Sequence, residues 1–215
     1  MPRAALSESE VEEFRETLCQ SATRLFALHG YDGVTMRALA TDLGCSPMTP
    51  YRYFENKAEI FLAVRMASFA RFASALERAT EDNPHHPARL PALARAYVAF
   101  ALEQPHAYRI MFELDQATSP GFNLNLDLRS WNVMFSAVEE AVALGALSGN
   151  PLVLAHLYWS GIHGIVALHL SGMLVLGTEL DELVDAFVER GTGKAANSNT
   201  TSDFIKAPPT LLESD

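Results

Sequence analysis

The residues best suited to bind a partner lie in one segment, TMRALATDLGCSPMTPYRYFENK, which runs from Thr35 to Lys57. Two short helical patterns in this segment are joined by Gly44, Cys45 and Ser46, an arrangement that predicts a helix-turn-helix. A short helix in the major groove of DNA needs polar side chains for base edges and phosphates, and one or two apolar residues to seat it. The second pattern offers Thr49, Tyr51, Arg52 and Tyr53 beside the apolar Phe54. DNA binding is one interpretation, and a helical hairpin inside a core is the other.

The rest of the chain supplies helices that position this segment. Strand patterns are nearly absent, because no sustained alternation of apolar and polar residues occurs. The first helix begins with a capping box of Ser7 and Glu10, carries an apolar stripe at three- and four-residue steps, and ends at Gly30. Further start and stop signals predict nine helices, which begin near residues 7, 35, 46, 56, 90, 105, 124, 151 and 179. The fold class that we expect is all-α.

The helices fall into regions of different composition. We expect a three-helix helix-turn-helix domain over residues 1–57, a connecting helix over residues 58–80, and a second helical domain over residues 81–190. The sequence EDNPHHP, with two prolines, marks the boundary at residues 81–87. Residues 191–215 are rich in Gly, Ser, Thr and Asn, a composition typical of a disordered tail.

The composition is that of an ordinary globular protein with an acidic balance. Of the 215 residues, 49% are apolar and 20% are charged, and 16 Lys and Arg against 26 Asp and Glu give a net charge of -10. Such a charge argues against a protein that coats nucleic acid by bulk attraction. Between Val34 and Lys57, however, three basic residues stand against two acidic ones. The average charge therefore does not exclude specific DNA recognition.

Several features indicate the cell interior. The two cysteines, Cys19 and Cys45, are too few for a disulfide framework, and the N-terminus lacks the apolar core of a signal peptide. The most apolar stretch, Ile162 to Leu176, is interrupted by histidines and glycines and falls short of the roughly 20 apolar residues of a membrane helix. We therefore expect a soluble, cytoplasmic protein that does not bind a membrane.

Residues Ala22 to Phe61 resemble the DNA-binding domain of the tetracycline-repressor (TetR) family. The resemblance rests on short motifs at set spacings, namely Leu25-Phe26, Gly30-Tyr31, Val34-Thr35-Met36, Leu39-Ala40, Leu43-Gly44-Cys45-Ser46, Tyr51-Arg52-Tyr53-Phe54 and Lys57-Ala58-Glu59-Ile60-Phe61. It implies a homodimeric transcriptional regulator, usually a repressor, that binds double-stranded DNA and is released by a small ligand. It also implies site roles: helix caps at Thr35 and Ser46, major-groove contacts from Met48, Thr49 and Pro50, phosphate contacts from Tyr51, Tyr53 and Lys57, and base or phosphate contacts from Arg37 and Arg52.

Pro50 departs from the family pattern, because most members have a leucine-like residue there. A proline cannot donate a hydrogen bond to the carbonyl of Ser46, and it biases Thr49 away from helical angles. The recognition helix therefore starts either at Ser46 or at Pro50 with Thr49 as its cap. The set of base contacts depends on which start is used.

A second resemblance covers Tyr158 to Gly164, which is similar to the Trp-His-Gly signature of one TetR-family C-terminal subgroup. Aromatic and methionine residues gather in this half of the chain, where they line either a ligand pocket or a plain core. The candidates for a pocket that holds a small apolar or amphipathic effector are Tyr97, Phe100, Tyr108, Met111, Phe112, Trp131, Met134, Phe135, Trp159 and His163.

Small residues on the eighth helix favour close approach of another helix, and we expect the eighth and ninth helices to form a homodimer. The interface candidates are Gly161, Gly164, Ala167, Leu180, Val184 and Phe187. A two-fold dimer presents two recognition helices on one face and therefore reads a palindromic operator. His156 and His163 share a face of the eighth helix, but no acidic residue or cysteine joins them at ligand spacing, which favours a core or interface role over a metal site.

Taken together, these patterns favour a ligand-responsive DNA-binding regulator that uses no cofactor and no metal. The alternative is an all-helical enzyme or small-molecule-binding protein with an incidental helix-turn-helix. An enzyme is disfavoured, because the sequence has no Gly-rich phosphate loop, no paired metal ligands and no G-x-S-x-G motif.

Overall fold

The computed structural model describes residues 7–85, 87–112, 128–175 and 177–191. Eight α-helices and one 3₁₀ turn follow one another along the chain: α1 (Glu8–His29), α2 (Met36–Asp42), η1 (Pro50–Arg52), α3 (Lys57–Asp82), α4 (Arg89–Glu103), α5 (Pro105–Phe112), α6 (Arg129–Ala143), α7 (Pro151–Leu170) and α8 (Leu180–Gly191). No strand occurs within these ranges, so the predicted all-α class is confirmed. The nine expected helices correspond to the eight α-helices and the 3₁₀ turn. The expected disordered tail lies outside the described residues from residue 192 onward.

Side-chain caps define where several helices begin. The hydroxyl of Ser7 accepts a hydrogen bond from the N–H of Glu10 at 3.3 Å, and the Glu10 carboxylate accepts one from the N–H of Ser7 at 2.8 Å. The predicted capping box of α1 is therefore confirmed. Thr35 caps α2 in the same manner, and Asn56 and Asn150 cap α3 and α7. These caps satisfy N–H groups that a helix start otherwise leaves without a partner.

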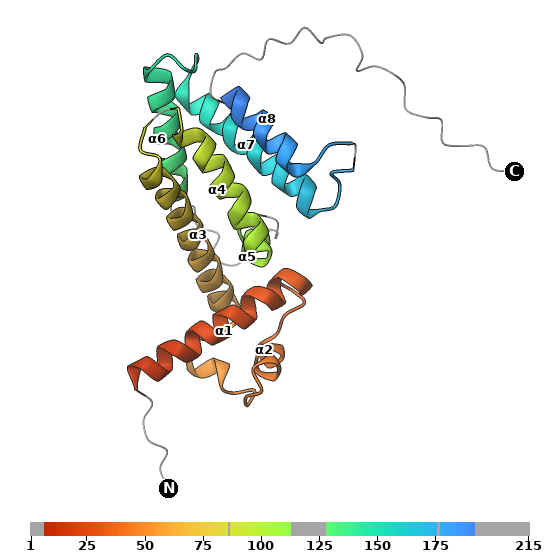
Figure 1. Ribbon diagram of the computed structural model, residues 1–215. Helices are drawn as coiled ribbons and strands as arrows, with labels where there is room; N and C mark the ends of the chain where they lie inside the picture. The colour runs from red at the N-terminus through yellow and green to blue at the C-terminus, as the bar shows by residue number, and fades with distance from the viewer. Residues whose placement is uncertain (1–6, 86, 113–127, 176, 192–215) are drawn as a thin grey trace, which may run out of the picture.

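The helices enclose two separate hydrophobic cores. The N-terminal core lies between α1, α2 and the beginning of α3, and Phe26, Leu39 and Ile60 are fully buried in it. The C-terminal core is formed by the remainder of α3 with α4 to α8, and it is rich in aromatic residues. Figure 1 shows α3 running from one region to the other, with α1 and α2 at its lower end. The expected boundary at residues 81–87 separates α3 from α4, yet both helices contribute to the C-terminal core.

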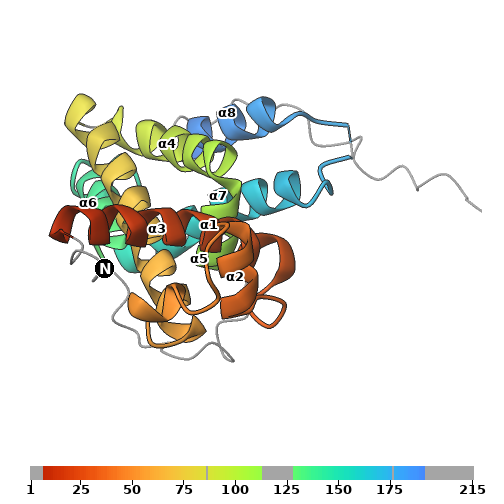
Figure 2. The same ribbon diagram turned by 90° about the horizontal axis from the view of Figure 1, so that it is seen from below.

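Helix α5 belongs to both cores. Tyr108 and Met111 are buried in the C-terminal core, whereas Ile110 is buried in the N-terminal core. This division is possible because Ile110 points to the opposite side of the helix from its neighbours, and α5 packs directly against α1. The view from below in Figure 2 shows α5 beside α1 and α2. The N-terminal and C-terminal cores are therefore joined by two elements, α3 and α5.

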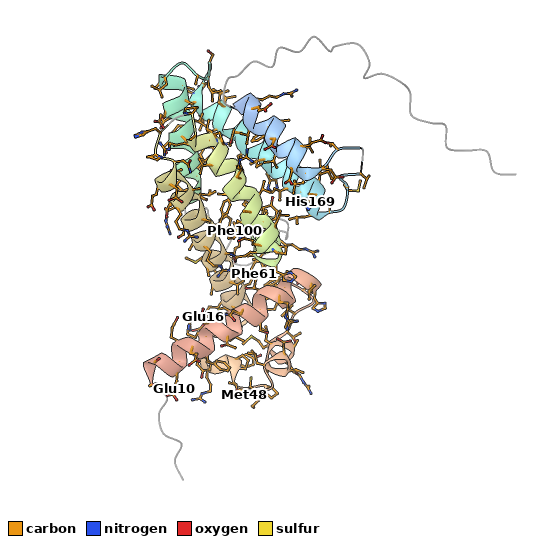
Figure 3. The ribbon with its side chains drawn as sticks, in the orientation of Figure 1. Glu10, Glu16, Met48, Phe61, Phe100 and His169 are labelled. Carbon is orange, nitrogen blue, oxygen red and sulfur yellow. The ribbon has the colours of Figure 1, made fainter. Side chains whose placement is uncertain are left out.

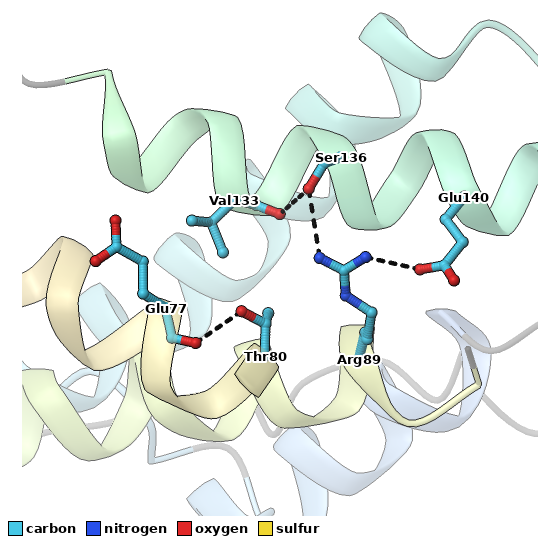
Figure 4. A network of polar contacts seen from close by, with 6 residues as sticks. All are labelled: Glu77, Thr80, Arg89, Val133, Ser136 and Glu140. Atoms are coloured by element: carbon cyan, nitrogen blue, oxygen red, sulfur yellow. Dashed lines mark hydrogen bonds and ion pairs between the residues drawn. The ribbon is translucent and has the colours of Figure 1, made fainter. Parts of the chain in front are cut away.

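Polar contacts hold α6 onto α3 and α4. Arg89 at the start of α4 donates to the carboxylate of Glu140 at 2.8 Å and to the hydroxyl of Ser136 at 3.5 Å, both on α6 (Figure 4). Arg129 at the start of α6 pairs with Glu77 of α3 at 2.5 Å. The hydrogen bond from Arg129 lowers the pKa of the Glu77 carboxyl. These pairs fix the end of the C-terminal core that lies away from α1.

Helix α7 has an unusual surface. Among the described helices it is long and apolar enough to cross a membrane, by length and composition alone, although core helices of soluble proteins pass the same test. Only 22% of its apolar window is buried within the chain. Val153, Leu157 and Leu168 on its outward face are exposed by 56%, 62% and 47%. An exposed apolar face of this extent is typical of a surface that contacts another molecule.

Candidate nucleic-acid interface

A glycine sets the turn of the helix-turn-helix. Helix α2 ends at Asp42, and Gly44 follows with a φ of 62°, in the left-handed region that favours glycine. This conformation brings the N–H of Cys45 back to the carbonyl of Ala40 at 2.9 Å, which closes the helix. The chain then enters residues 46–53, which we name the recognition segment.

The recognition segment consists of two short turns and not of one continuous helix. The N–H of Thr49 donates to the carbonyl of Ser46 at 2.8 Å, and η1 begins at Pro50. Because Pro50 has no N–H, the Ser46 carbonyl receives no α-helical bond from it. Of the two predicted starts, the one at Pro50 is observed, although the side chain of Thr49 makes no capping bond. The Ser46 hydroxyl instead accepts a hydrogen bond from the N–H of Met48 at 3.4 Å.

The predicted DNA-binding residues differ in how far their side chains are exposed to solvent. Met48 is 67% exposed and Tyr51 is 49% exposed, and Figure 3 shows Met48 at the lower end of the molecule, away from the C-terminal helices. Four more of the predicted DNA-binding residues are exposed, namely Thr35, Arg37, Ser46 and Arg52. Pro50 is buried, so the expectation that it faces the groove is wrong. Its ring lies on the inner side of the segment, while Thr49 is half-buried.

Helix α1 holds the end of the recognition segment in place. The guanidinium of Arg15 donates to the carbonyl of Tyr53 at 2.6 Å and lies 4.2 Å from the centre of the Phe54 ring. The ring of Phe14 stacks on that of Tyr53, with 4.4 Å between their centres. Sequence reasoning did not find the roles of Phe14 and Arg15. The apolar stripe of α1 contained Phe14, but nothing local indicated that Arg15 reaches a residue 38 positions later.

The predicted phosphate ligand Lys57 already has a partner in this structure. Its ammonium donates to the carbonyl of Tyr31 at 2.8 Å and lies 4.1 Å from the centre of the Tyr31 ring. The side chain is half-buried. An ammonium group has three donors, so this arrangement leaves further N–H groups for a phosphate. The phosphate role of Lys57 stays a prediction.

An ion pair fixes α2 against α1. The carboxylate of Asp42 accepts a hydrogen bond from Ser21 at 2.6 Å and pairs with Arg24, both on α1. The hydrogen bonds from Ser21 and then Arg24 lower the pKa of the Asp42 carboxyl. Arg37 and Arg52, by contrast, are exposed and make no ion pair within the described residues. Among the arginines of the helix-turn-helix, these two are therefore the ones available to a nucleic acid.

The predicted ligand-pocket residues form a connected aromatic cluster behind this surface. Tyr97, Phe100, Tyr108, Met111 and Met134 are buried, and Trp131, Phe135, Phe112 and His163 are half-buried. The Nδ1 atom of His163 lies 3.0 Å from the Tyr97 hydroxyl and 2.7 Å from the Tyr108 hydroxyl. Trp159, at 37% exposed, connects this group to Trp131, with 6.1 Å between the two ring centres. Sequence reasoning missed Phe69 and Phe72 of α3, which belong to the same cluster.

The structure corrects part of the predicted dimer interface. Leu180 and Val184 are buried in the C-terminal core, and a Cβ atom on Gly161 would lie 2.6 Å from the Phe187 ring of the same chain. These four residues hold α8 against α7 within one chain. Gly164 and Ala167 differ, because they line an open groove of about 640 Å³ between α7 and α5. They remain candidates for contact with a second molecule.

Two family descriptions match the chain. Residues 18–64 match "Bacterial regulatory proteins, tetR family", and residues 90–191 match "Tetracyclin repressor-like, C-terminal domain". The second description names no Trp-His-Gly subgroup, so that finer assignment stays a prediction. The two matches fall on the two cores, with the middle of α3 between them.

Relatives with a named function are regulators. The chain is 33% identical over 94 residues to the HTH-type transcriptional repressor AcnR of Corynebacterium diphtheriae, covering 41% of this chain and 50% of that protein. It is 28% identical over 192 residues to the AcnR repressor of Corynebacterium efficiens, covering 82% of this chain and 93% of that protein. The alignment thus spans half of the first relative and nearly all of the second.

Solved structures show the same fold. A protein of unknown function from Rhodococcus sp. RHA1 is 30% identical with a TM-score of 0.70, covering 89% of this chain and 96% of that one. A TetR family transcription regulator from Marinobacter aquaeolei VT8 is 20% identical with a TM-score of 0.69, covering 85% and 97%. The second likeness concerns the fold alone.

Proposed function

The chain belongs to the TetR family of bacterial transcriptional regulators, and from that premise we propose that it is a repressor that binds a palindromic operator as a homodimer and leaves it when a small ligand binds. Its fold and its relatives are those of DNA-binding regulators and not of enzymes. The observation that carries the proposal is the exposure of four side chains of the helix-turn-helix, namely Arg37, Met48, Tyr51 and Arg52. Repression is supported by the Corynebacterium relatives, which are repressors. We expect the protein to act in the cytoplasm, where bacterial DNA lies.

The recognition segment offers two kinds of DNA contact. Met48 and Thr49 enter the major groove, where an apolar side chain meets the thymine methyl group and a hydroxyl meets a base edge. Tyr51, Tyr53 and Lys57 contact phosphates, and such contacts fix the register of the protein without reading sequence. Arg37 and Arg52 reach either phosphates or base edges, and Thr35 caps the start of α2 beside the backbone. The predicted cap at Ser46 is not part of the proposal, because the recognition helix starts at Pro50 and the Ser46 hydroxyl accepts its hydrogen bond from the N–H of Met48.

The proposed dimer covers the apolar face of α7. Val153, Leu157, Gly164 and Leu168 recur at steps of four, seven and four residues, so they form one stripe along the helix. Gly164 has open space beside it, since a Cβ atom there would meet nothing within 4 Å. A second copy related by a two-fold axis would bury the stripe against itself, because the same patch serves both subunits. This cover accounts for the length and apolarity of α7 without a membrane.

The proposed effector acts through α5. A ligand in the C-terminal core meets Tyr108 on one side of this helix, and Ile110 on the other side is buried in the N-terminal core. A shift of α5 or α3 would therefore change the position of α1, and with it the clamp that Arg15 forms on Tyr53. The ligand releases DNA to the extent that it binds the shifted conformation more tightly.

Fluorescence anisotropy with DNA from upstream of the chain's own coding region tests the function. The full chain should bind one labelled fragment in preference to a scrambled fragment of equal length, and a cell extract that contains the effector should release it. Absence of any specific binding, with and without extract, would favour the alternative of a small-molecule-binding protein with an incidental helix-turn-helix.

The oligomeric state is tested separately by analytical ultracentrifugation. Leu157→Glu places a charge in the proposed interface and should convert a dimer into a monomer at micromolar concentration. Leu102→Glu, at a residue that is 44% exposed on α4, is the matched control and should remain dimeric. A wild-type chain that sediments only as a monomer would contradict the dimer.

A further inference from the structure

One side chain, Phe112, occupies the centre of the aromatic cluster in the C-terminal core. Its ring centre lies 5.0 Å from that of Tyr108, 5.1 Å from that of His163 and 5.7 Å from that of Phe69. Three further rings lie between 6.1 and 6.5 Å away, namely Phe72, Tyr97 and Trp159. Aromatic rings from α3, α4, α5 and α7 thus surround the last residue of α5.

Neutral hydrogen-bonding groups lie beside this ring. The hydroxyls of Tyr97 and Tyr108 both approach Nδ1 of His163, and the two tyrosines are 4% and 0% exposed. Burial raises the pKa of the Tyr97 hydroxyl to about 12, further above neutral pH than its ordinary value of 10. Polar groups cost free energy to bury, and a purely apolar core would need none of them. The presence of these polar groups beside the Phe112 ring points to a site that recognises a ligand.

We propose that the Phe112 ring occupies the place of an effector ring, and that the effector is an uncharged planar ring compound carrying a hydroxyl or carbonyl oxygen. The effector ring packs where Phe112 lies, and its oxygen bonds to the Tyr108–His163 pair. An uncharged ligand is favoured because the polar groups described beside the Phe112 ring, namely the Tyr97 and Tyr108 hydroxyls and the His163 imidazole, form hydrogen bonds with one another. The inference rests on the proposed function, since it names the ligand class of the same effector site.

Displacement of Phe112 has a mechanical consequence. Ile110 lies two residues earlier on α5 and is fully buried in the N-terminal core. When the ring of Phe112 leaves the cluster, the end of α5 moves with it. This movement changes how Ile110 packs against α1. The structure with Phe112 inside the cluster is therefore the DNA-binding form, and the effector-bound form has Phe112 outside.

The test measures the binding of two simple probes, phenol and toluene, to the full-length chain by isothermal titration calorimetry. Phe112→Ala opens a ring-sized space and removes the cost of displacing the wild-type ring, so both probes should bind at least about tenfold more tightly than to wild type. Phe100→Ala is the control, because Phe100 is a buried ring of the same core whose centre lies 5.1 Å from that of Phe72, but it belongs to no ring pair with Phe112 or His163. No gain in Phe112→Ala, or an equal gain in Phe100→Ala, would overturn the proposal.

A second comparison tests the polar end of the site. Adding Tyr108→Phe to Phe112→Ala should weaken phenol binding by about threefold to tenfold, the factor of one neutral hydrogen bond, and leave toluene binding unchanged. Equal effects on both probes, or no effect on phenol, would contradict the assigned oxygen contact. Should Phe112→Ala fail to fold, Phe112→Leu makes a smaller space and should give a smaller gain with the same preference for phenol.

Operator binding by the same proteins separates this inference from the proposed function. A wild-type chain that binds operator, together with variants that gain no affinity for either probe, contradicts the Phe112 site and leaves the regulator intact. A chain that binds no DNA specifically contradicts the proposed function itself. Loss of operator affinity when phenol saturates the wild-type chain would support both, because only that chain has a Phe112 ring to displace.

Discussion

The N-terminal and C-terminal regions hold their polar side chains in opposite places. Around the N-terminal core, Arg37, Tyr51 and Arg52 are exposed, while the core itself is built mainly from apolar side chains. In the C-terminal core, Tyr97, Tyr108 and His163 point inward and bond to one another. A large partner such as DNA is met on an exposed surface, whereas a small ligand has to be enclosed. The contrast fits the two proposed roles: the N-terminal region, which we call the reading region, binds DNA, and the C-terminal region, which we call the sensing region, holds the effector.

The two regions are nevertheless joined by shared residues. Helix α5 contributes Ile110 to one core and Met111 to the other, although the two are neighbours in sequence. Helix α3 does the same over a greater length, with Ile60 and Val64 in the N-terminal core and Phe72 and Leu76 in the C-terminal core. Changes at these positions should reveal how far the two regions depend on each other.

The largest effect is expected at the shared helix. Ile110→Ala should lower the free energy of unfolding by about 2–5 kcal/mol, because it leaves a cavity in the N-terminal core. Urea denaturation at fixed protein concentration measures this loss. Leu102→Ala, at an exposed residue of α4, should change stability by less than about 0.5 kcal/mol. Equal losses in the two variants would show that α5 does not support the reading region.

A smaller effect is expected within the sensing region alone. Gly161→Ala should cost about 1–3 kcal/mol, because the new methyl group would lie 2.6 Å from the ring of Phe187. Thermal denaturation of the variant measures the loss. Adding Phe187→Leu should recover part of this loss. The double variant should therefore lose less stability than the two single variants lose in sum. A Gly161→Ala chain as stable as wild type would mean that α7 and α8 are not in close contact.

The outward charges of the reading region should affect binding and not folding. Arg37→Ala and Arg52→Ala should each weaken operator binding and reduce the slope of its salt dependence by about one unit. Their unfolding free energies should stay near that of wild type, since neither guanidinium makes an ion pair within the described residues. Arg95→Ala removes a charge on α4 that pairs with Asp185, and it serves as the control. Unchanged salt slopes would remove both arginines from the DNA contact.

The smallest effect is a pH dependence at the joint of α1 and α2. Hydrogen bonds from Ser21 and Arg24 depress the pKa of Asp42 below its ordinary value of 3.8. A depressed carboxyl pKa contributes stability that is present above the unfolded pKa and is lost as pH falls through the folded pKa. Wild type should therefore lose more stability than Asp42→Asn between about pH 5 and pH 2.

Unfolding free energies at several pH values measure this difference. Asp32→Asn removes an exposed carboxylate that makes no ion pair within the described residues, and its pH dependence should follow wild type. Identical curves for all three proteins would show that Asp42 does not hold α2 against α1.

The reading region was the more predictable of the two, because its signals are local. The capping box at Ser7, the cap at Thr35 and the turn at Gly44 each depend on residues within one helical turn. The inward position of Pro50 and the contact of Arg15 with Tyr53 could not be predicted, since both depend on how α1 crosses a segment far along the chain.

In the sensing region the sequence indicated helices and apolar faces but not neighbours. Helix α7 is apolar on every side, so its sequence does not show which side turns inward, nor that Gly161 meets Phe187 of the same chain. For the same reason the aromatic candidates were recognised as a group, while their arrangement around Phe112 and the part played by Phe72 were not. Long-range packing carries no local signature in a single sequence.

The most direct test of the central claim, a symmetric reader of DNA, is the selection of bound sequences from random double-stranded DNA by the purified full chain. We predict that the selected sequences contain a palindrome whose half-sites lie about one helical turn apart, or a multiple of it, as two recognition segments in a two-fold dimer require. Recovery of sequences without two-fold symmetry, or no enrichment at all, would contradict the claim.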